Sequence, residues 1–176
     1  GRNIHDNLMV LRDTIDYVEL DNSEAALISI DQEKAFDRIS WKYLFTVLTK
    51  MGIPLNLIKW IKLLYSNPNC NIIVNNFIGS PVKVSRGIRQ GCPLSPLLYS
   101  ICAEGLASLA RTDCDLKGIV TPGGESSIRL IQHADDITFF IGDNKEFVTI
   151  NNILSTYCKG SGSKLNVEKS KGMWLG

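Results

Sequence analysis

Acidic residues are missing from more than a third of this chain. The 176 residues include 18 Asp and Glu and 19 Lys and Arg, with a formal net charge of +1, but no acid occurs from Arg38 to Ala103. A surface without carboxylates suits a phosphate backbone. Solvated helix faces and a basic edge strand would give the same pattern, and net charge alone predicts no nucleic-acid partner. The bases of the stretch are Arg38, Lys42, Lys50, Lys59, Lys62, Lys83, Arg86 and Arg89.

Paired cysteines and long apolar runs are also absent. The five cysteines are widely spaced, and no Cys-x-x-Cys pair occurs. This excludes a zinc ribbon and a thioredoxin motif, and the odd count fits a reducing compartment. No uncharged apolar run approaches the ~20 residues of a membrane span, so no membrane partner is predicted. An apolar content of 44 % and a charged content of 21 % are those of a globular domain rather than a disordered chain.

Apolar periodicity predicts a mixture of helices and strands. Helices are expected at Ile4–Leu20, from Ser40 through Met51, from Pro54 to about Ser66, from Ser95 to about Ala110 and at Phe147–Cys158. Strands are expected at Ala25–Asp31, Cys70–Asn75, Pro81–Ser85, Gly118–Val120, Ser127–Gln132 and Ile137–Ile141, with a polar loop and a last short strand in Leu165–Leu175. The elements mix without strict alternation, which predicts an α+β fold with an antiparallel sheet.

Some boundaries follow from single residues. Ser40 and Ser95 are expected to be N-caps, and Pro96 opens the second of these helices. The turn between the two middle strands is expected to hold Asn76 and Gly79. Gly160–Gly162 is expected to end the last helix.

Carboxylates stand at the ends of two predicted strands. Asp31 ends the first strand, and Asp135 and Asp136 occupy the tip of a later hairpin. If the two strands are neighbours in one sheet, these side chains share one rim, where carboxylates and substrate phosphates suit Mg²⁺. The alternative is ordinary turn chemistry, because Asp favours tight turns.

The order and spacing of five motifs resemble those of a reverse transcriptase, above all of the non-LTR (LINE-type) retrotransposon group, with group II intron enzymes a more distant second. The resemblance covers essentially the whole chain, and each motif alone would be weak. The motifs are Gly1–Asn3 with Asp6-Asn7, Asp31–Asp37, Arg89–Pro96, His133–Asp136 and Gly162–Ser170.

The resemblance implies the palm of an RNA-directed DNA polymerase, an antiparallel sheet backed by helices, with part of the fingers. Residues 1–24 and about 46–88 would be fingers-side, and residues 25–45 and 89–176 palm. It implies dNTPs, an RNA template with a DNA primer, and two Mg²⁺ ions that Mn²⁺ can replace. The thumb, the earlier fingers motifs and an endonuclease are expected elsewhere in a parent chain, and the family implies cytoplasm and nucleus as compartments.

The same resemblance assigns the nucleotide site. Asp31 and Asp135 match the metal-binding carboxylates, and Asp136 matches a third, auxiliary one. Phe36 matches the bulky residue that excludes a 2′-hydroxyl, although a core aromatic is a serious rival. Gln90 and Gly91 match the loop near the incoming nucleotide and template base, where glycine permits close approach.

Basic residues complete the implied site. Lys169 matches a lysine proposed to protonate or neutralise the pyrophosphate leaving group, while Lys164 and Lys171 are near enough in sequence to confuse the assignment. Arg2 matches a fingers residue that grips the triphosphate. Arg89, with Arg86, flanks the loop as a candidate template contact, and ordinary surface arginines are equally consistent.

One position departs from the family. His133 stands where Tyr, or sometimes Phe, precedes Ala-Asp-Asp. This leaves open an inactive remnant or an RNA- or protein-binding scaffold with the same fold. A two-metal nuclease using the same carboxylates is a further rival, but it gives no role to Phe36 or to the Arg89–Pro96 loop.

Overall fold

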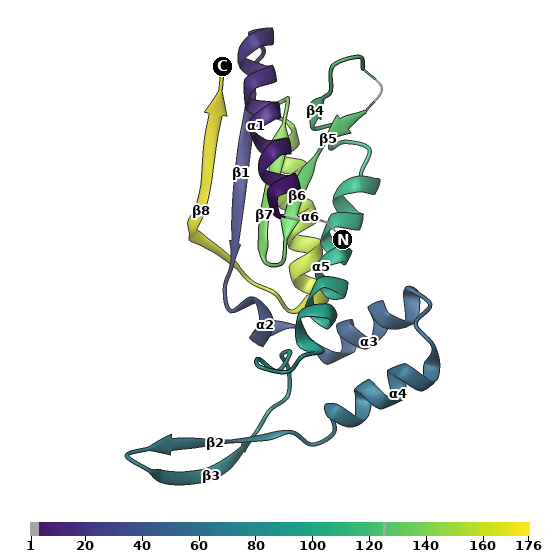
Figure 1. The fold of residues 1–176 in the computed structure, drawn as a ribbon, viewed down its shortest axis with the longest axis vertical. Coiled ribbons are helices and arrows are strands. Elements are labelled where there is room, and N and C mark those ends of the chain that lie inside the picture. Colours follow the sequence, from purple (N-terminus) through teal and green to yellow (C-terminus); the bar gives the residue numbers. More distant parts are fainter. Residues whose placement is uncertain (1–3, 125) are drawn as a thin grey trace.

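The computed structural model describes residues 4–124 and 126–176, and Arg2 lies outside them. Its centre is a four-stranded antiparallel sheet in the order β6-β7-β1-β8, which brings strands from distant parts of the chain side by side (Figure 1). These strands are β1 (Ala25–Gln32), β6 (Leu130–His133), β7 (Asp136–Ile141) and β8 (Leu165–Leu175).

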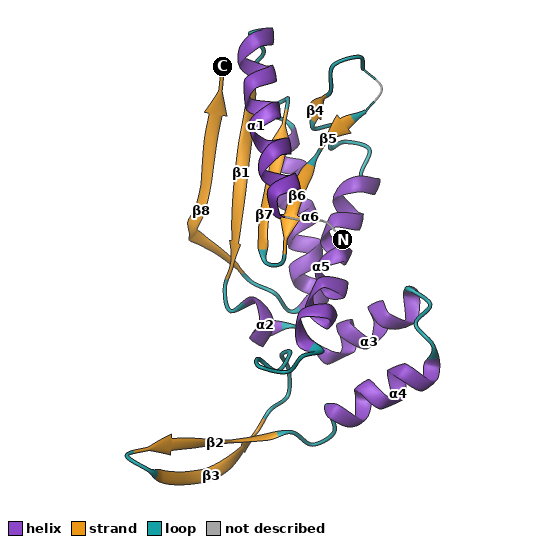
Figure 2. Cartoon of the chain, viewed as in Figure 1, coloured by secondary structure: helices purple, strands orange, loops and turns teal. Residues whose placement is uncertain are grey.

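Alternating side chains of the sheet build two cores, one on each face. On one face Ile30 and Phe139 pack with buried residues of α5 (Ser95–Thr112) and α6 (Glu146–Ser161). On the other, Leu27 and Phe140 pack with Val18 of α1 (Ile4–Asp21). Figure 2 shows the resulting helix–sheet–helix layers.

A third core lies below the sheet, and most of its residues come from the acid-free part of the chain, which includes the start of α5. Its members include Leu44 and Leu48 of α3 (Trp41–Lys50), Ile58 of α4 (Leu55–Leu64) and Leu98 of α5. The short helix α2 (Ala35–Arg38) connects β1 to this core through buried Ala35.

A two-stranded hairpin projects away from these cores (Figure 1). It consists of β2 (Asn69–Val74) and β3 (Phe77–Lys83), and every residue of both strands is exposed. The remaining strands, β4 (Ile119–Val120) and β5 (Ser127–Ile128), pair only with each other. No helix in the described part of the chain is long and apolar enough to cross a membrane.

The structure confirms the α+β class and the antiparallel sheet, but several predicted boundaries were wrong. The β2–β3 turn consists of Asn75 and Asn76, both with positive φ, and Gly79 lies inside β3. The strand predicted at Ser127–Gln132 is two strands, because its first residues pair with β4 and its last with β7. Arg129, between them, donates through its side chain to three carbonyls at the end of α5. The tail is one eleven-residue strand, since β1 pairs with it near both ends, with a shift in register between Ser29 and Asp31.

At the helix ends, one expectation is confirmed and two differ. Ser40 occupies the N-cap of α3 without a side-chain capping bond. Leu94 is the N-cap of α5, and the Ser95 hydroxyl donates to the Arg89 carbonyl instead. Gly160 is helical, and only Gly162, with φ of 82°, ends α6.

Candidate active site

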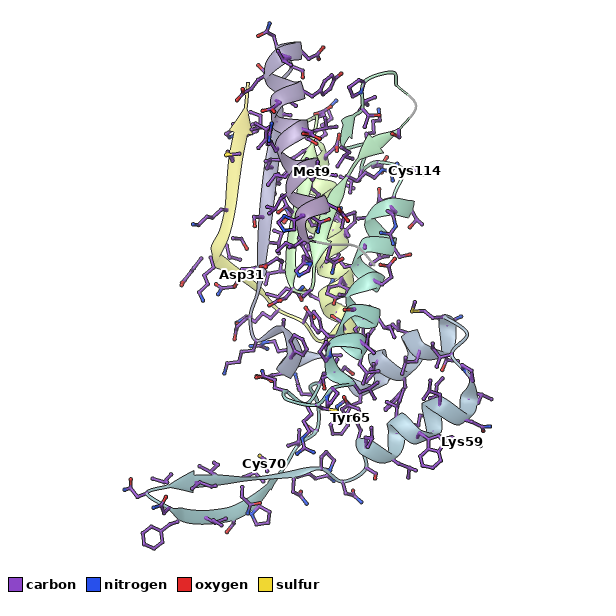
Figure 3. All side chains as sticks on the ribbon, in the orientation of Figure 1. Met9, Asp31, Lys59, Tyr65, Cys70 and Cys114 are labelled. Atoms are coloured by element: carbon purple, nitrogen blue, oxygen red, sulfur yellow. The ribbon has the colours of Figure 1, made fainter. Side chains whose placement is uncertain are left out.

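The predicted metal-binding carboxylates share one end of the sheet. β1 and β7 are antiparallel with Ile30 opposite Ile137, so the next step in register sets Asp31 opposite Asp136. Asp135 lies in the two-residue turn between β6 and β7, because His133 pairs with Asp136 across it. Figure 3 shows Asp31 at the lower end of β1, beside the bend of β8. The common rim expected from the sequence is therefore present.

The local backbone explains how the turn presents its acids. Ala134 has a φ of 54°, a left-handed conformation uncommon for a residue with a side chain, and this closes the turn in two residues. Asp135 and Asp136 are exposed, and Asp31 is half-buried. Burial is the main cause that raises the pKa of Tyr99 in α5, and the neighbouring Tyr157 and then Asp135 add to the rise electrostatically.

The rim offers suitable ligand chemistry for Mg²⁺. Carboxylate oxygens are the hard donors that this ion takes, and it normally completes its shell with water and substrate phosphates. Among the residues the structure describes, no three His, Cys, Asp or Glu side chains gather into a metal centre by themselves. Asp31 and Asp135 are the carboxylates at this rim that could supply such donors.

Phe36 connects the rim to a pocket. Its ring stacks on that of Tyr99, with centroids 4.3 Å apart and planes 17° from parallel. It also lines a pocket of about 480 Å³ together with Gln90, Gly91 and Cys92. Phe36 is thus a core aromatic on one side and a pocket wall on the other, and its exclusion of a 2′-hydroxyl stays a prediction.

The loop before α5 is fastened to α2 by backbone hydrogen bonds. The Ile88 N–H donates to the Phe36 carbonyl at 2.7 Å, and the Gly87 N–H donates to Ile39 at 2.8 Å. Gly87 has a φ of 93°, and a Cβ there would lie 2.8 Å from the Asp37 carbonyl oxygen, so only glycine fits. These contacts fix the pocket wall relative to Phe36.

The loop's polar residues lie at the mouth of the pocket. The Gln90 amide donates to Asp37 Oδ1 at 3.2 Å. Gly91 has a φ of 78° and open space beside its Cα, which lets another molecule approach the backbone. The Arg86 and Arg89 side chains are exposed on the same loop.

The tail distinguishes the three candidate lysines. Lys164 Nζ lies 2.8 Å from Glu33 Oε2, and Lys171 pairs with Ser29 within the sheet. Lys169 is exposed where β8 departs from regular pairing with β1, next to Ser170, which contacts the backbone of Asp31. Ser170 adjoins Lys171 as well, so what distinguishes Lys169 is its place in the irregular part of β8.

Sequence reasoning missed Gln32, Tyr99 and Ser170. Gln32 and Tyr99 are buried, and their side-chain polar atoms lack a well-formed hydrogen bond, although the Gln32 amide is near enough to oppose the rise in the pKa of Tyr99. Helical spacing places Tyr99 on the same inner face of α5 as Leu98 and Cys102. No local signal marks Ser170, because its partner is 139 residues away.

Comparison with known proteins places this arrangement in a family. The chain belongs to the reverse transcriptase (RNA-dependent DNA polymerase) family, whose model matches residues 1–175. It is 31 % identical over its whole length to the transposon TX1 uncharacterized 149 kDa protein of Xenopus laevis, covering 13 % of that protein. It is 26 % identical over 93 % of its length to a retrovirus-related Pol polyprotein from the type-1 retrotransposable element R2 of Popillia japonica, covering 26 % of it. The predicted resemblance to the non-LTR retrotransposon group is confirmed.

Solved structures agree on the fold. Telomerase from Candida albicans, in complex with a TWJ fragment of telomeric RNA, matches 98 % of this chain with a TM-score of 0.69 and 14 % identity, over 30 % of the telomerase chain. Telomerase from Candida tropicalis gives a TM-score of 0.70 at 14 % identity, with 97 % of this chain and 29 % of that chain covered. The chain thus has the fold of a reverse transcriptase and spans less than a third of each of these relatives.

Proposed function

We propose that this chain is the catalytic core of an RNA-directed DNA polymerase of a LINE-like retroelement. The observation that carries the proposal is the meeting of Asp31 with Asp135 and Asp136 at one sheet end, near the Phe36–Tyr99 stack that borders the pocket. The reaction is attack of a primer 3′-hydroxyl on the α-phosphate of a dNTP, with pyrophosphate leaving. Positioning and charge neutralisation supply most of the catalysis of such a transfer.

The carboxylates hold the reacting groups. Asp31 and Asp135, with Asp136 auxiliary, would bind two Mg²⁺ ions, which when bound polarise the phosphate and activate the hydroxyl. The antiparallel pairing of β1 and β7 keeps these acids in place without a change in backbone. The pre-set rim supports orientation of the triphosphate and primer end.

The pocket selects the nucleotide. Phe36, held from behind by Tyr99, occupies the space that a ribose 2′-hydroxyl would need. Gln90 and the open backbone of Gly91 face the incoming nucleotide and template base. The loop keeps its position relative to Phe36 because the Ile88 N–H donates to the Phe36 carbonyl.

Basic residues act on the phosphates. Lys169, in the irregular part of β8, would neutralise or protonate the leaving pyrophosphate. Arg89 would contact the template strand, and Arg2, outside the described residues, the triphosphate. Residues 1–24 and about 46–88 would be fingers-side, and the thumb and endonuclease would come from the rest of a parent chain acting in cytoplasm and nucleus.

A second candidate is an inactive reverse-transcriptase-like remnant or scaffold that binds RNA or protein. The observation that favours it is His133, which is exposed beside Asp136 at the hairpin tip in place of the expected aromatic ring. The intact Asp31, Asp135 and Asp136 favour the polymerase.

The test is primer extension by the full parent protein on an RNA template with a DNA primer, dNTPs and Mg²⁺. We expect extension by the unmodified protein and a loss of more than about 100-fold in Asp135→Asn, since that variant removes charge from the metal site. Asp115→Asn, an exposed site far from the rim, is the matched control and should extend normally.

His133→Tyr separates the two candidates. Extension only by His133→Tyr would mean that the site is sound and that His133 is the lesion. If neither protein extends while both fold and bind primer–template, the polymerase proposal is wrong and the scaffold remains.

A further inference from the structure

The pairing of β8 with β1 is broken beside Asp31. From Ala25 opposite Leu175 to Ser29 opposite Lys171 the register is regular, but Asp31 then pairs with Asn166. β8 therefore contains extra residues at this point, which form a bulge. Such a bulge deprives the backbone of β1 of its regular partners at the residue that bears the carboxylate.

Ser170 closes the break with its side chain. The Asp31 N–H donates to Ser170 Oγ at 3.2 Å, and the Ser170 hydroxyl donates to the Asn166 carbonyl at 2.8 Å. A hydroxyl accepts and donates at once, so one side chain satisfies β1 and ties both ends of the bulge. Ser170 is half-buried, which limits competition from water.

The bond anchors Asp31 on the side away from β7. Two residues further on, the Glu33 N–H donates to the Lys164 carbonyl at 2.8 Å. The chain around β8 is therefore hydrogen-bonded to the chain around β1 on both sides of the break. Without the Ser170 hydroxyl, the Asp31 N–H would lose this hydrogen bond. The Asp31 carboxylate would then vary in position relative to Asp135.

We propose that Ser170 is a positioning residue for the Asp31 carboxylate. It acts through the Asp31 backbone and touches neither substrate nor phosphate. Its role in metal binding rests on the proposed function, whereas its bond to Asp31 can be tested separately. The same bulge also contains Lys169, so Asp31 and Lys169 both border the segment that Ser170 ties together.

The experiment compares Ser170→Ala, Ser170→Thr and Thr156→Ala in the full parent protein. Thr156 is a hydroxyl control: it is exposed and donates to Asn152 within α6. Hydrogen exchange of a peptide containing Asp31 reports the bond, and Mn²⁺ binding to a complex with a dideoxy-terminated primer, followed by electron paramagnetic resonance, reports the metal site. Extension kinetics give kcat, the KM for dNTP and the Mg²⁺ requirement.

We expect Ser170→Ala to weaken Mn²⁺ affinity and raise the half-saturating Mg²⁺ concentration by about 10-fold, as loss of a group that orients a metal ligand does. The KM for dNTP should stay within about 2-fold, and exchange at Asp31 should be faster. Ser170→Thr keeps the hydroxyl and should restore the Mn²⁺ affinity, the half-saturating Mg²⁺ concentration and the exchange rate at Asp31. Thr156→Ala should change none of them.

Unchanged Mn²⁺ affinity in Ser170→Ala, or a Ser170→Thr variant as defective as Ser170→Ala, would overturn the proposal. If the unmodified protein neither extends primers nor binds Mn²⁺, the proposed function has failed. Exchange at Asp31 then still decides the role of the hydroxyl, since an unchanged rate in Ser170→Ala would exclude it.

Discussion

The Phe36 ring stacks on Tyr99 with one face and borders the pocket with the other side. Tyr99, fully buried in α5, supports its inner face, and the outer side borders the pocket with Gly91 and Cys92. A ring supported in this way cannot retreat into the core, because protein interiors are close-packed. It therefore sets the shape of the pocket wall.

The first prediction concerns this ring. Phe36→Val should admit ribonucleotides and lower the selectivity for dNTP over rNTP by about 10- to 100-fold, the range in which a few carbon atoms in a pocket discriminate. Competing incorporation of dNTP and rNTP measures the ratio. Phe147→Val, at an exposed position 51 % accessible in α6, is the matched control. Selectivity equal to that of the unmodified protein would assign Phe36 to the core alone.

The sequence predicted site residues that lie in short motifs, and it did not predict residues that contact them from distant segments. Asp31, Asp135 and Phe36 belong to short motifs whose spacing is visible in one chain. Tyr99 and Ser170 act through the ring stack with Phe36 and a bond to Asp31, which exist only after the fold brings distant segments together. Their residue types carry no signal by themselves.

At the scale of elements, apolar periodicity predicted strands and helices well where one face is buried. It failed for the first part of β8, where polar residues follow one another without alternation. Exposure is not the reason, because the fully exposed strands β2 and β3 were predicted. Strand β8 exists because β1 pairs with it. Tertiary pairing, rather than propensity, decides such an edge strand.

Glu33 joins three elements through its carboxylate. It pairs with Lys164 before β8 and with Arg38 of α2. The hydrogen bond from Lys164, followed by that from Arg38, lowers the pKa of Glu33 from 4.5 to about 2. A carboxylate whose pKa is lower in the folded state stabilises that state above its unfolded pKa and loses this contribution as pH falls.

The second prediction follows from the lowered pKa of Glu33 in the folded state. The free energy of unfolding of the unmodified protein should exceed that of Glu33→Gln above about pH 4.5, and the difference should vanish as pH falls toward about 2. The effect should be modest, because the pair is partly exposed to solvent. Denaturant unfolding between pH 7 and pH 3 measures it, with Lys164→Ala as the second arm of a double-mutant cycle. A difference in the free energy of unfolding that stays constant over this pH range would contradict the link between the lowered pKa of Glu33 and stability.

At the scale of the whole molecule, charge divides along the fold. The acid-free stretch from Arg38 to Ala103 forms α3, α4, the β2–β3 hairpin and the first half of α5. These elements lie below and beside the carboxylate rim (Figure 1). A strand of nucleic acid entering the site would therefore meet a surface without carboxylates. This supports a role for the acid-free stretch, named the acid-free lobe below, in holding the template. The near-neutral net charge conceals this division.

The last prediction tests that surface with matched pairs of lysines. Lys59 on α4, labelled in Figure 3, and Lys83 on β3 are exposed in the acid-free lobe, whereas Lys117 and Lys145 are exposed in loops at the other end of the sheet. Replacing Lys59 and Lys83 by Ala should weaken binding of single-stranded RNA and reduce the slope of log K against log salt by about 1.4, since each lost phosphate contact removes about 0.7. Fluorescence anisotropy of the full parent protein over a series of salt concentrations gives the slope. Replacing Lys117 and Lys145 removes the same charge and should leave the slope unchanged. If both double variants lower it equally, net charge rather than this lobe governs binding, and the acid-free stretch is a solvated surface.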